Sequence, residues 1–363
     1  IGAMTSAQLA AIGSQALRGM DTGDIQSLGY DQLNALTTAQ MAGLGADQMR
    51  AIRGDSIGGI NTVAFAALNS AAIRALSEEQ IWNLNSSQIA ALSSSQIAAL
   101  QSQQLNSLAS NDYIVQTSYL TTKQMAMLTS AQISALSTRV IVSLETQDLA
   151  AISSGAVGGL TSTQLGAFSE EMLNALTTRQ ITLLKPAVWN SLRYEQMIAL
   201  NTGEIHSLTT AQIAALDSSH LQWLSVQQVQ SLTSSQVIAL SSSQLGALDF
   251  YTLASTQVAA LTSGQISGIA NDTLAAMDNS QFSWFSSKAL AGLTSTQIQA
   301  LSPEKIAAFG TQQIASLKAM QLAALTDDQL RALETTDMAV LGTAQFAAFS
   351  SAQYGVFSEE QIG

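Results

Sequence analysis

The chain contains 363 residues, of which 10% are charged, and it has a formal net charge of −12 and no cysteine. The lack of cysteine excludes disulfide bonds and thiolate metal sites, and the acidic balance argues against nucleic-acid binding through neutralisation of phosphates. No apolar stretch approaches the roughly 20 residues that cross a bilayer, so we expect no membrane span in this segment.

An eight-residue repeat runs through nearly the whole sequence, with the form Ser/Thr-Ser/Thr-x-Gln-Ile/Leu-x-Ala-Leu. With the first Ser/Thr as position 1, the frame holds over residues 5–108, 121–248 and 254–357, which contain 42 copies. Positions 5 and 8 are apolar or aromatic in all 42 copies. A fixed short period of this kind predicts a solenoid, in which neighbouring repeats share one core.

The blocks of repeats follow one another along the chain with two breaks. The first block covers residues 1–108, the second 121–248 and the third 254–363, and the aromatic interruptions 109–120 and 249–253 separate them. The chain starts and ends inside a repeat. We therefore expect one continuous solenoid that is an excerpt from a longer array.

Each repeat is predicted to form one very short helix. Position 1 is Ser, Thr, Asp, Asn or Gly in 33 of the 42 copies, and these residue types are favoured at helix N-caps. Position 4 is Gln in 26 copies, which is the spacing of a capping box. Both prolines lie at position 2, the first helical residue, where the missing N–H costs nothing. The structural capping residues that we single out are Gln88, Gln96, Gln212, Gln236, Pro186 and Pro303.

The same period excludes a continuous helix. At 3.6 residues per turn, eight residues advance the apolar pair by about 80° past two full turns, so the apolar side chains would wind around the helix. A strand fits poorly too, because apolar spacing of i and i+3 does not match a period of two. The sequence predicts an all-α fold, an α-solenoid or superhelix of about two-turn helices with one helix per repeat, and a β-solenoid remains the alternative.

The candidate contact residues are aromatic side chains at the interruptions and bulky side chains at position 7. Position 7 is Ala, Gly or Ser in 35 of 42 copies, which lets helix backbones approach closely, so a large residue there marks a place where the superhelix opens or meets a partner, or fills a local gap. Insertions in solenoids often bind partners, but a repaired slip in repeat number also explains the interruptions. The candidates are Tyr113, Tyr119, Phe250, Tyr251, Trp223 and Trp284.

No motif in the sequence indicates catalysis, a metal or a cofactor. His206 and His220 have no spaced set of His, Asp or Glu around them, and no nucleophile elbow or phosphate-binding glycine loop is present. Arg53 to Asp55 spell the cell-attachment tripeptide Arg-Gly-Asp, for which a chance match is the default in a repeat that contains Gly and Asp. We therefore expect that the chain is not an enzyme and uses no cofactor.

The repeat itself resembles a known type of array. Residues 208–216 read Leu-Thr-Thr-Ala-Gln-Ile-Ala-Ala-Leu, and this pattern resembles the short octapeptide arrays, Leu-Ser/Thr-Ser/Thr-x-Gln-Ile/Val-x-Ala-Leu, of very large secreted or surface-attached bacterial proteins described as adhesin-like. The resemblance covers nearly the entire chain. It implies a secreted or cell-surface location in a bacterium and offers no catalytic or ligand-binding residue to transfer.

These observations favour a structural role. The leading hypothesis is a rod or filament segment of a bacterial surface or extracellular protein, which holds an adhesive or protective element away from the cell. Self-association is expected, because small Ser, Thr, Ala and Gln side chains with few charges can pack laterally at little desolvation cost. One alternative is a solenoid module that binds a surface protein or a glycan through the aromatic interruptions. Another is binding to ice or a mineral surface by rows of Ser and Thr.

Overall fold

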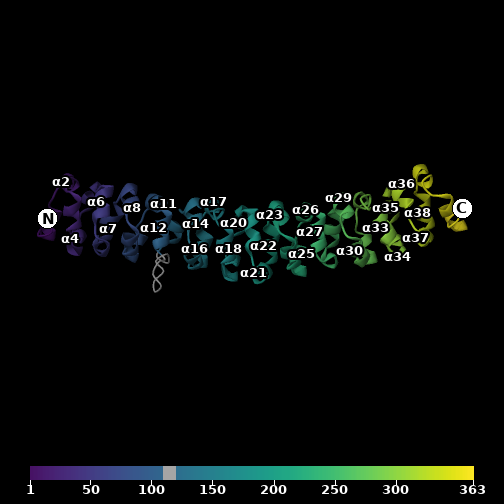
Figure 1. Cartoon of the computed structure of the whole chain (residues 1–363), viewed down its shortest axis with the longest axis horizontal. Coiled ribbons are helices and arrows are strands. Elements are labelled where there is room, and N and C mark those ends of the chain that lie inside the picture. The colour runs from purple at the N-terminus through teal and green to yellow at the C-terminus, as the bar shows by residue number, and fades with distance from the viewer. Residues whose placement is uncertain (109–119) are drawn as a thin grey trace. The chain divides into compact units, whose positions relative to one another are not determined.

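The structure, a computed structural model, describes residues 1–108 and 120–363 (Figure 1). The regular elements among these residues are α-helices and 3-10 helices of three to six residues, and no strand occurs among them. The predicted all-α fold with one very short helix per repeat is therefore confirmed. The β-solenoid alternative is wrong for the described residues. Tyr113 and Tyr119 lie outside them.

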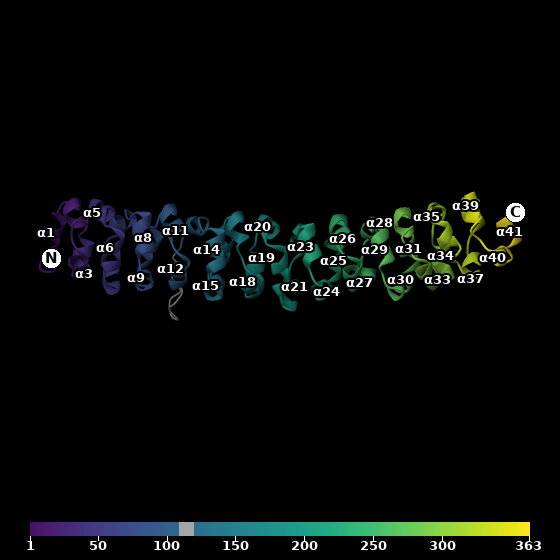
Figure 2. The same cartoon turned by 45° about the horizontal axis from the view of Figure 1, so that its top comes forward.

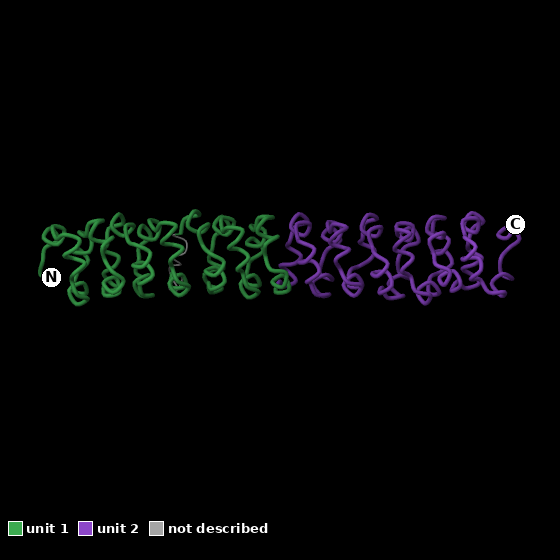
Figure 3. Tube along the Cα trace, turned by 90° about the horizontal axis from the view of Figure 1, so that it is seen from above, with its two compact units in different colours: residues 1–191 green, residues 192–363 purple. Residues whose placement is uncertain are grey.

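The chain divides into two compact units, residues 1–191 and residues 192–363, coloured green and purple in Figure 3. The first unit contains α1 (Ser6–Ala10), α2 (Ser14–Arg18), α3 (Thr22–Gln26), α4 (Tyr30–Asn34), α5 (Thr38–Gly43), α6 (Ala46–Ala51), η1 (Gly54–Gly59), α7 (Thr62–Ala66), α8 (Ser70–Ala75), α9 (Glu78–Trp82), α10 (Ser86–Ala90), α11 (Ser94–Ala99), α12 (Ser102–Ser107), α13 (Thr122–Met125), α14 (Ser130–Ala135), α15 (Thr138–Val142), α16 (Thr146–Ala151), α17 (Ser154–Val157), α18 (Ser162–Gly166), α19 (Glu170–Asn174), α20 (Thr178–Leu183) and η3 (Pro186–Ser191).

The second unit contains α21 (Tyr194–Ala199), α22 (Thr202–Ser207), α23 (Thr210–Ala215), α24 (Ser218–Gln222), α25 (Val226–Ser231), α26 (Ser234–Ala239), α27 (Ser242–Ala247), η4 (Phe250–Thr252), α28 (Ser255–Ala260), α29 (Ser263–Ser267), α30 (Asn271–Ala276), α31 (Asn279–Phe282), α32 (Ser287–Leu290), α33 (Ser295–Ala300), α34 (Pro303–Ala307), α35 (Thr311–Ser316), α36 (Ala319–Leu322), α37 (Asp327–Arg331), α38 (Thr335–Ala339), α39 (Thr343–Phe346), α40 (Ser351–Tyr354) and α41 (Glu359–Ile362).

The repeat around α11 shows why each helix is so short. Ser93 is the N-cap, with an extended backbone (φ −72°, ψ 164°), and its side chain accepts a hydrogen bond from the Gln96 N–H. Leu100 at position 8 is also extended (φ −61°, ψ 134°), and its N–H donates to Ile97 O at 3.2 Å. The chain thus leaves the helical conformation at position 8 and stays extended through the next N-cap. The extended residues at positions 8 and 1 therefore bend the chain once every eight residues.

Each repeat packs against repeats in the neighbouring turns of the superhelix. Helices three places apart along the chain are in contact, as in the pairs α2 and α5, α6 and α8, and α8 and α11. Figure 1 and Figure 2 show α6, α8 and α11 following one another along one edge of the first unit. The Gln side chains reach backbone carbonyls four places back. One turn therefore takes between three and four repeats, a number that the sequence left open.

The core consists of the side chains at positions 5 and 8, and Ile97 and Leu100 are both buried. Position 7 is small because it faces backbone. A Cβ atom on Gly159 would lie 2.1 Å from Ser130 O, three places back, and a Cβ on Gly292 would lie 2.1 Å from the corresponding carbonyl of Ser263. Real Cβ contacts are essentially never this close, so these two glycines allow the closest approach of successive turns.

The second interruption is a shortened repeat that occupies one full place in the superhelix. Asp249 accepts a hydrogen bond from the Tyr251 N–H at 3.1 Å and begins η4, and Phe250 and Leu253 are buried where positions 5 and 8 would lie. Gln257 accordingly reaches Val229 O only 28 residues back, whereas the regular separation to a position 5 carbonyl is 31. Segment 249–253 is three residues shorter than a regular repeat, but it still fills the position of one repeat in the superhelix.

The hydrogen bonds that span the first interruption join residues that lie further apart in the sequence than in a regular repeat. Nε2 of Gln124 donates to Ile89 O, 35 residues back, and to Leu92 O, 32 residues back. Each separation is four residues longer than in the regular repeats. This difference equals the four residues by which segment 109–120 exceeds one octad. The longer separations are therefore accounted for by the sequence, and Gln124 binds the same two carbonyl positions as Gln in a regular repeat.

Candidate functional site

The recurring polar feature of both units is the buried Gln at position 4, whose amide is hydrogen-bonded at both of its polar atoms. Oε1 of Gln88 accepts a hydrogen bond from the Asn85 N–H at 3.0 Å. Its Nε2 donates to Ile57 O at 3.0 Å and to Ile60 O at 2.8 Å, four repeats earlier. The residue is fully buried, with 0% of its surface exposed. One side chain thus caps the start of its own helix and the end of a helix in the preceding turn.

The other capping residues chosen from the sequence occupy matching places. Oε1 of Gln96, Gln212 and Gln236 accepts from the N–H of the position 1 residue at 2.7, 2.7 and 2.6 Å. Nε2 of Gln96 and Gln236 donates to a position 8 carbonyl 28 residues back at 2.7 and 2.6 Å. Pro186 is the first residue of η3 and Pro303 the first residue of α34.

Sequence reasoning identified the capping box and missed the link between turns. A signal for this link was present in the sequence. Glu satisfies a capping box as well as Gln does, yet position 4 is Gln in 26 copies and Glu only once, at Glu204. A preference for the amide over the carboxylate indicates that the N–H donors are used, because these donors are what Gln has and Glu lacks.

Three buried carboxyl groups replace the amide at position 4. They are Glu204, Asp148 and Asp337. Burial raises the pKa of Glu204 and of Asp337, and burial together with the nearby Glu145 raises the pKa of Asp148. The cause is desolvation, which disfavours the charged form of a carboxyl group. An ionised carboxylate also has no N–H to offer to the preceding turn.

His220 replaces the amide in a different way. Its Nδ1 lies 2.6 Å from the Asp217 carboxylate, and its Nε2 lies 3.0 Å from Leu192 O, 28 residues back. The hydrogen bond from His220 lowers the pKa of the Asp217 carboxyl group. The imidazole thus reaches the position 8 carbonyl that a Gln would bind, while its other nitrogen contacts the side chain of the N-cap residue instead of its backbone N–H. His206 is elsewhere, with Nδ1 3.1 Å from Ser231 O. Among the described residues, no group of three His, Cys, Asp or Glu could hold a metal.

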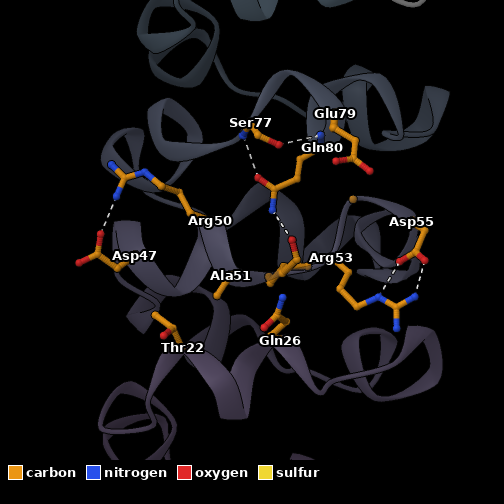
Figure 4. Close-up of a pocket in the computed structure, with 12 residues that line it drawn as sticks. Thr22, Gln26, Asp47, Arg50, Ala51, Arg53, Asp55, Ser77, Glu79 and Gln80 are labelled. Atoms are coloured by element: carbon orange, nitrogen blue, oxygen red, sulfur yellow. Dashed lines mark hydrogen bonds and ion pairs between the residues drawn. The ribbon is translucent and has the colours of Figure 1, made fainter.

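A polar hollow of about 700 Å³ lies on the first unit (Figure 4). Its walls come from the repeats that begin at residues 21, 45, 53 and 77. In Figure 4, Thr22 and Gln26 lie on one side, and Ser77, Glu79 and Gln80 lie on the other.

The two arginines of this hollow are held in local ion pairs. Arg50 lies 2.5 Å from Asp47, and Arg53 lies 2.5 Å from Asp55. Figure 4 shows Arg50 and Arg53 extending in opposite directions. Hydrogen bonding to Arg53 and Ser56 lowers the pKa of Asp55. The Arg-Gly-Asp tripeptide therefore has its two charged side chains bound to each other.

The four described contact candidates are dispersed. Phe250 is a core residue with 3% exposure, whereas Tyr251 is 55% exposed and its hydroxyl donates to Ala276 O. Trp223 is half-buried, with its ring edge-to-face with Tyr194 at a centroid distance of 5.9 Å. Trp284 is also half-buried.

A second hollow lies beside the exposed Tyr251, where the repeat is three residues short. It measures about 310 Å³, and its lining includes Asp249, Tyr251, Asp272, Thr273 and Met277. An aromatic ring, two carboxyl groups and a hydroxyl thus line one small depression.

None of the helices within residues 1–108 and 120–363 has both the length and the apolar character that a bilayer span needs.

These features define the class of protein. Short helices, one per repeat, which are joined from turn to turn by buried glutamines, make this chain an α-solenoid repeat protein. The chain belongs to the ALTTAQ repeat family, because seven matches to that family together cover more than half of it. Ala35 to Gln40 read Ala-Leu-Thr-Thr-Ala-Gln. The matched residues are 1–38, 17–53, 57–93, 141–178, 191–226, 274–311 and 330–363.

The comparison with curated proteins gave no match to this chain. The family matches themselves are longer than one octad. Each spans more residues than the 28 to 31 that separate a position 4 Gln from the carbonyls it binds, and the match over residues 57–93 includes the complete link from Gln88 to Ile57 and Ile60.

Replacing Gln88 by Glu tests the link between turns. The new carboxylate would keep the acceptor for Asn85 but would stand against the carbonyls of Ile57 and Ile60. We expect Gln88→Glu to lower the free energy of unfolding by about 3 kcal/mol at pH 7, measured by urea denaturation followed by circular dichroism. The matched control is Gln8→Glu, because Gln8 is exposed and its Oε1 accepts only the cap hydrogen bonds of Thr5. Equal effects of the two substitutions would contradict the assigned role.

Replacing Glu204 by Gln tests the buried carboxyl groups through pH. The pKa of Glu204 is raised in the folded chain, so the folded state loses stability as the pH rises from the ordinary carboxyl pKa through the raised value. We expect Glu204→Gln to increase the free energy of unfolding most at pH 7 and to lose this advantage towards pH 4. Urea denaturation across this range measures the difference. A gain that is independent of pH would show that desolvation of the carboxylate is not its cause.

Proposed function

We propose that the chain is a rod or filament segment of a bacterial cell-surface or extracellular protein, an adhesin-like stalk that acts as a scaffold. One observation supports this proposal most directly. Each linked repeat donates its buried hydrogen bonds to the repeat four places earlier, as Gln88 does to Ile57 and Ile60, so further repeats can be added without any change in the packing of those already present. A protein built in this way suits the task of spanning a distance.

The surface composition supports self-association as part of this role. The residues that do not form the core are mostly Ser, Thr, Ala and Gln, and only 10% of the chain is charged. The small Ser, Thr and Ala side chains among them lose little conformational freedom when two arrays pack side by side. We propose no catalytic activity, since the buried polar groups at position 4 serve to join the turns.

The proposed location has its own test. A chain without cysteine is compatible with an oxidising environment, and the repeat resembles surface-attached arrays. Antibodies against the repeats should label intact cells of the producing bacterium. Labelling that occurs only after the cells are lysed would contradict a surface location.

Lengthening the array tests the scaffold role. We expect that duplicating residues 205–236, four regular repeats, increases the maximum dimension of the protein by a constant increment for each added copy, because each copy adds one set of packed turns. Small-angle X-ray scattering measures this dimension. In the same data, forward scattering per unit mass should rise with concentration if arrays associate laterally. A dimension that grows only as the cube root of the mass would contradict a rod, and constant forward scattering would contradict self-association.

A second candidate function is glycan binding at the shortened repeat. The observation that favours it is the hollow beside Tyr251, because an exposed aromatic ring can stack on the apolar face of a sugar while Asp249, Asp272 and Thr273 accept hydrogen bonds from its hydroxyls. This function is compatible with a stalk that also adheres.

Two substitutions at Tyr251 test this candidate. We expect Tyr251→Ala to abolish retention on an array of immobilised glycans, because the stacking surface is removed, whereas Tyr251→Phe keeps the ring and should retain binding. Circular dichroism checks that both variants remain helical. Absence of binding by the unmodified chain, or equal binding by the Ala variant, would rule out this site.

A further inference from the structure

The hollow beside Tyr251 includes a repeat that lacks the usual amide at position 4. In the repeat before it, Nε2 of Gln265 donates to Leu240 O at 2.8 Å, which lies 25 residues back because the shortened repeat intervenes. The next repeat has Thr273 at position 4. The same separation of 25 residues leads from Thr273 to Leu248, whose carbonyl is therefore the one that a Gln at this position would bind.

The carbonyl oxygen of Leu248 is left as an acceptor without a protein donor. Within residues 1–108 and 120–363, no N–H or O–H group is hydrogen-bonded to it. Leu248 is only 4% exposed, and it lines the hollow together with Thr273. A buried acceptor without a partner costs free energy. A ligand that enters the hollow and donates a hydrogen bond to this oxygen therefore recovers that cost.

The charged groups that line the hollow are all acidic. Asp249 and Asp272 belong to its lining, and both residues are exposed. The lining contains no Lys, Arg or His, and residues 194–287 contain no Lys or Arg at all. Lys305, four repeats after Asp272, has its Nζ 6.0 Å from the centre of the Phe282 ring. The two carboxyl groups thus have no cationic side chain beside them in this lining, and their field attracts a cationic ligand.

The Tyr251 ring is anchored at the edge of the hollow. Its hydroxyl donates to Ala276 O, and its backbone N–H donates to the Asp249 carboxylate at 3.1 Å. The residue is nevertheless 55% exposed. A ring that is already held in place loses little conformational freedom when a ligand stacks on it, and the face of an aromatic ring attracts positive charge. A rigid ligand ring that carries a cationic group matches both properties.

We propose that this hollow binds an amino sugar whose free amine is protonated. The ammonium group donates hydrogen bonds to Leu248 O and to the carboxylates of Asp249 and Asp272, and it serves as donor where a Gln amide serves in other repeats. The sugar ring stacks on Tyr251. Acetylation of the amine removes the charge and leaves a single N–H donor, so the free amine decides the affinity. This inference rests on the second candidate function, glycan binding at the shortened repeat, and it names the class of glycan.

A matched pair of oligosaccharides tests the ligand. Tetramers of glucosamine and of N-acetylglucosamine with the same linkage differ only at the amine. We expect the glucosamine tetramer to bind the whole chain about tenfold more tightly at pH 6, measured by isothermal titration calorimetry. Tetralysine presents ammonium groups on flexible side chains without a sugar ring, and it should bind about tenfold more weakly than the glucosamine tetramer.

The outcomes separate this inference from the function on which it rests. Equal affinity for the two tetramers, or retention only of glycans without an amine, would overturn the inference and leave glycan binding in place. Binding of tetralysine as tight as that of the glucosamine tetramer would overturn the assignment to a sugar. Absence of binding to every glycan would overturn the candidate function as well.

Two substitutions test the site itself. Asp272→Asn removes one carboxylate at nearly constant size, and we expect it to weaken binding of the glucosamine tetramer about tenfold. Thr273→Gln supplies the missing amide to Leu248 O and should weaken binding at least as much, because the side chain then occupies the site of the ammonium group. The matched control is Asp327→Asn, which removes the same charge from the first turn of α37 and should leave the affinity unchanged. Circular dichroism checks that the variants remain helical.

The control decides whether the hollow or the net charge of the chain binds the sugar. Unchanged affinity of the Asp272→Asn chain, or an equal loss in the Asp327→Asn chain, would show general attraction to an acidic protein and would overturn the site. This comparison changes only exposed side chains, so it decides the question even if the Thr273→Gln chain fails to fold.

Discussion

The structure depends on a primary amide that is hydrogen-bonded at both of its polar atoms. A helix of five or six residues leaves most of its N–H and C=O groups without a partner inside the helix, so its stability is decided at its ends. Gln88 accepts from the N-terminus of its own helix and donates to the C-terminal carbonyls of a helix four places earlier. This single side chain therefore provides a partner for an N–H group at the start of one helix and for C=O groups at the end of another. As a result, the stability of each helix depends on the preceding turn.

Side chains other than Gln can reach the position 8 carbonyl of the preceding turn. Nε2 of His220 lies 3.0 Å from Leu192 O, and Nδ2 of Asn61, an N-cap residue, donates to Leu36 O at 3.0 Å. Repeat length is also adjustable. Residues 249–253 lack three residues but keep their place, because Phe250 and Leu253 still fill the core. The packing therefore depends on how many repeats make up each turn of the superhelix, and it tolerates changes in the number of residues within a repeat.

The same constraint bears on function. The matches to the ALTTAQ repeat family are several octads long. A single octad contains a donor and an acceptor that cannot meet each other. Only a stretch longer than one turn closes the link. A protein of this design can vary in length and in local strength without changing the packing of its other repeats. This property suits the scaffold role that we propose, and it allows aromatic side chains such as Tyr251 to be added at isolated places.

The sequence by itself determined the period, the position of each N-cap, the identity of the core residues and the all-α class, because these follow from contacts within eight residues. It indicated the small side chain at position 7 but did not reveal that Gly159 faces Ser130. Only the tertiary structure decided how many repeats make a turn, which carbonyl each Gln binds, and that Phe250 is buried while Tyr251 is exposed. These features depend on residues roughly three to four repeats apart, and a repeating sequence offers many equivalent partners at such separations, so the choice among them is made by three-dimensional packing.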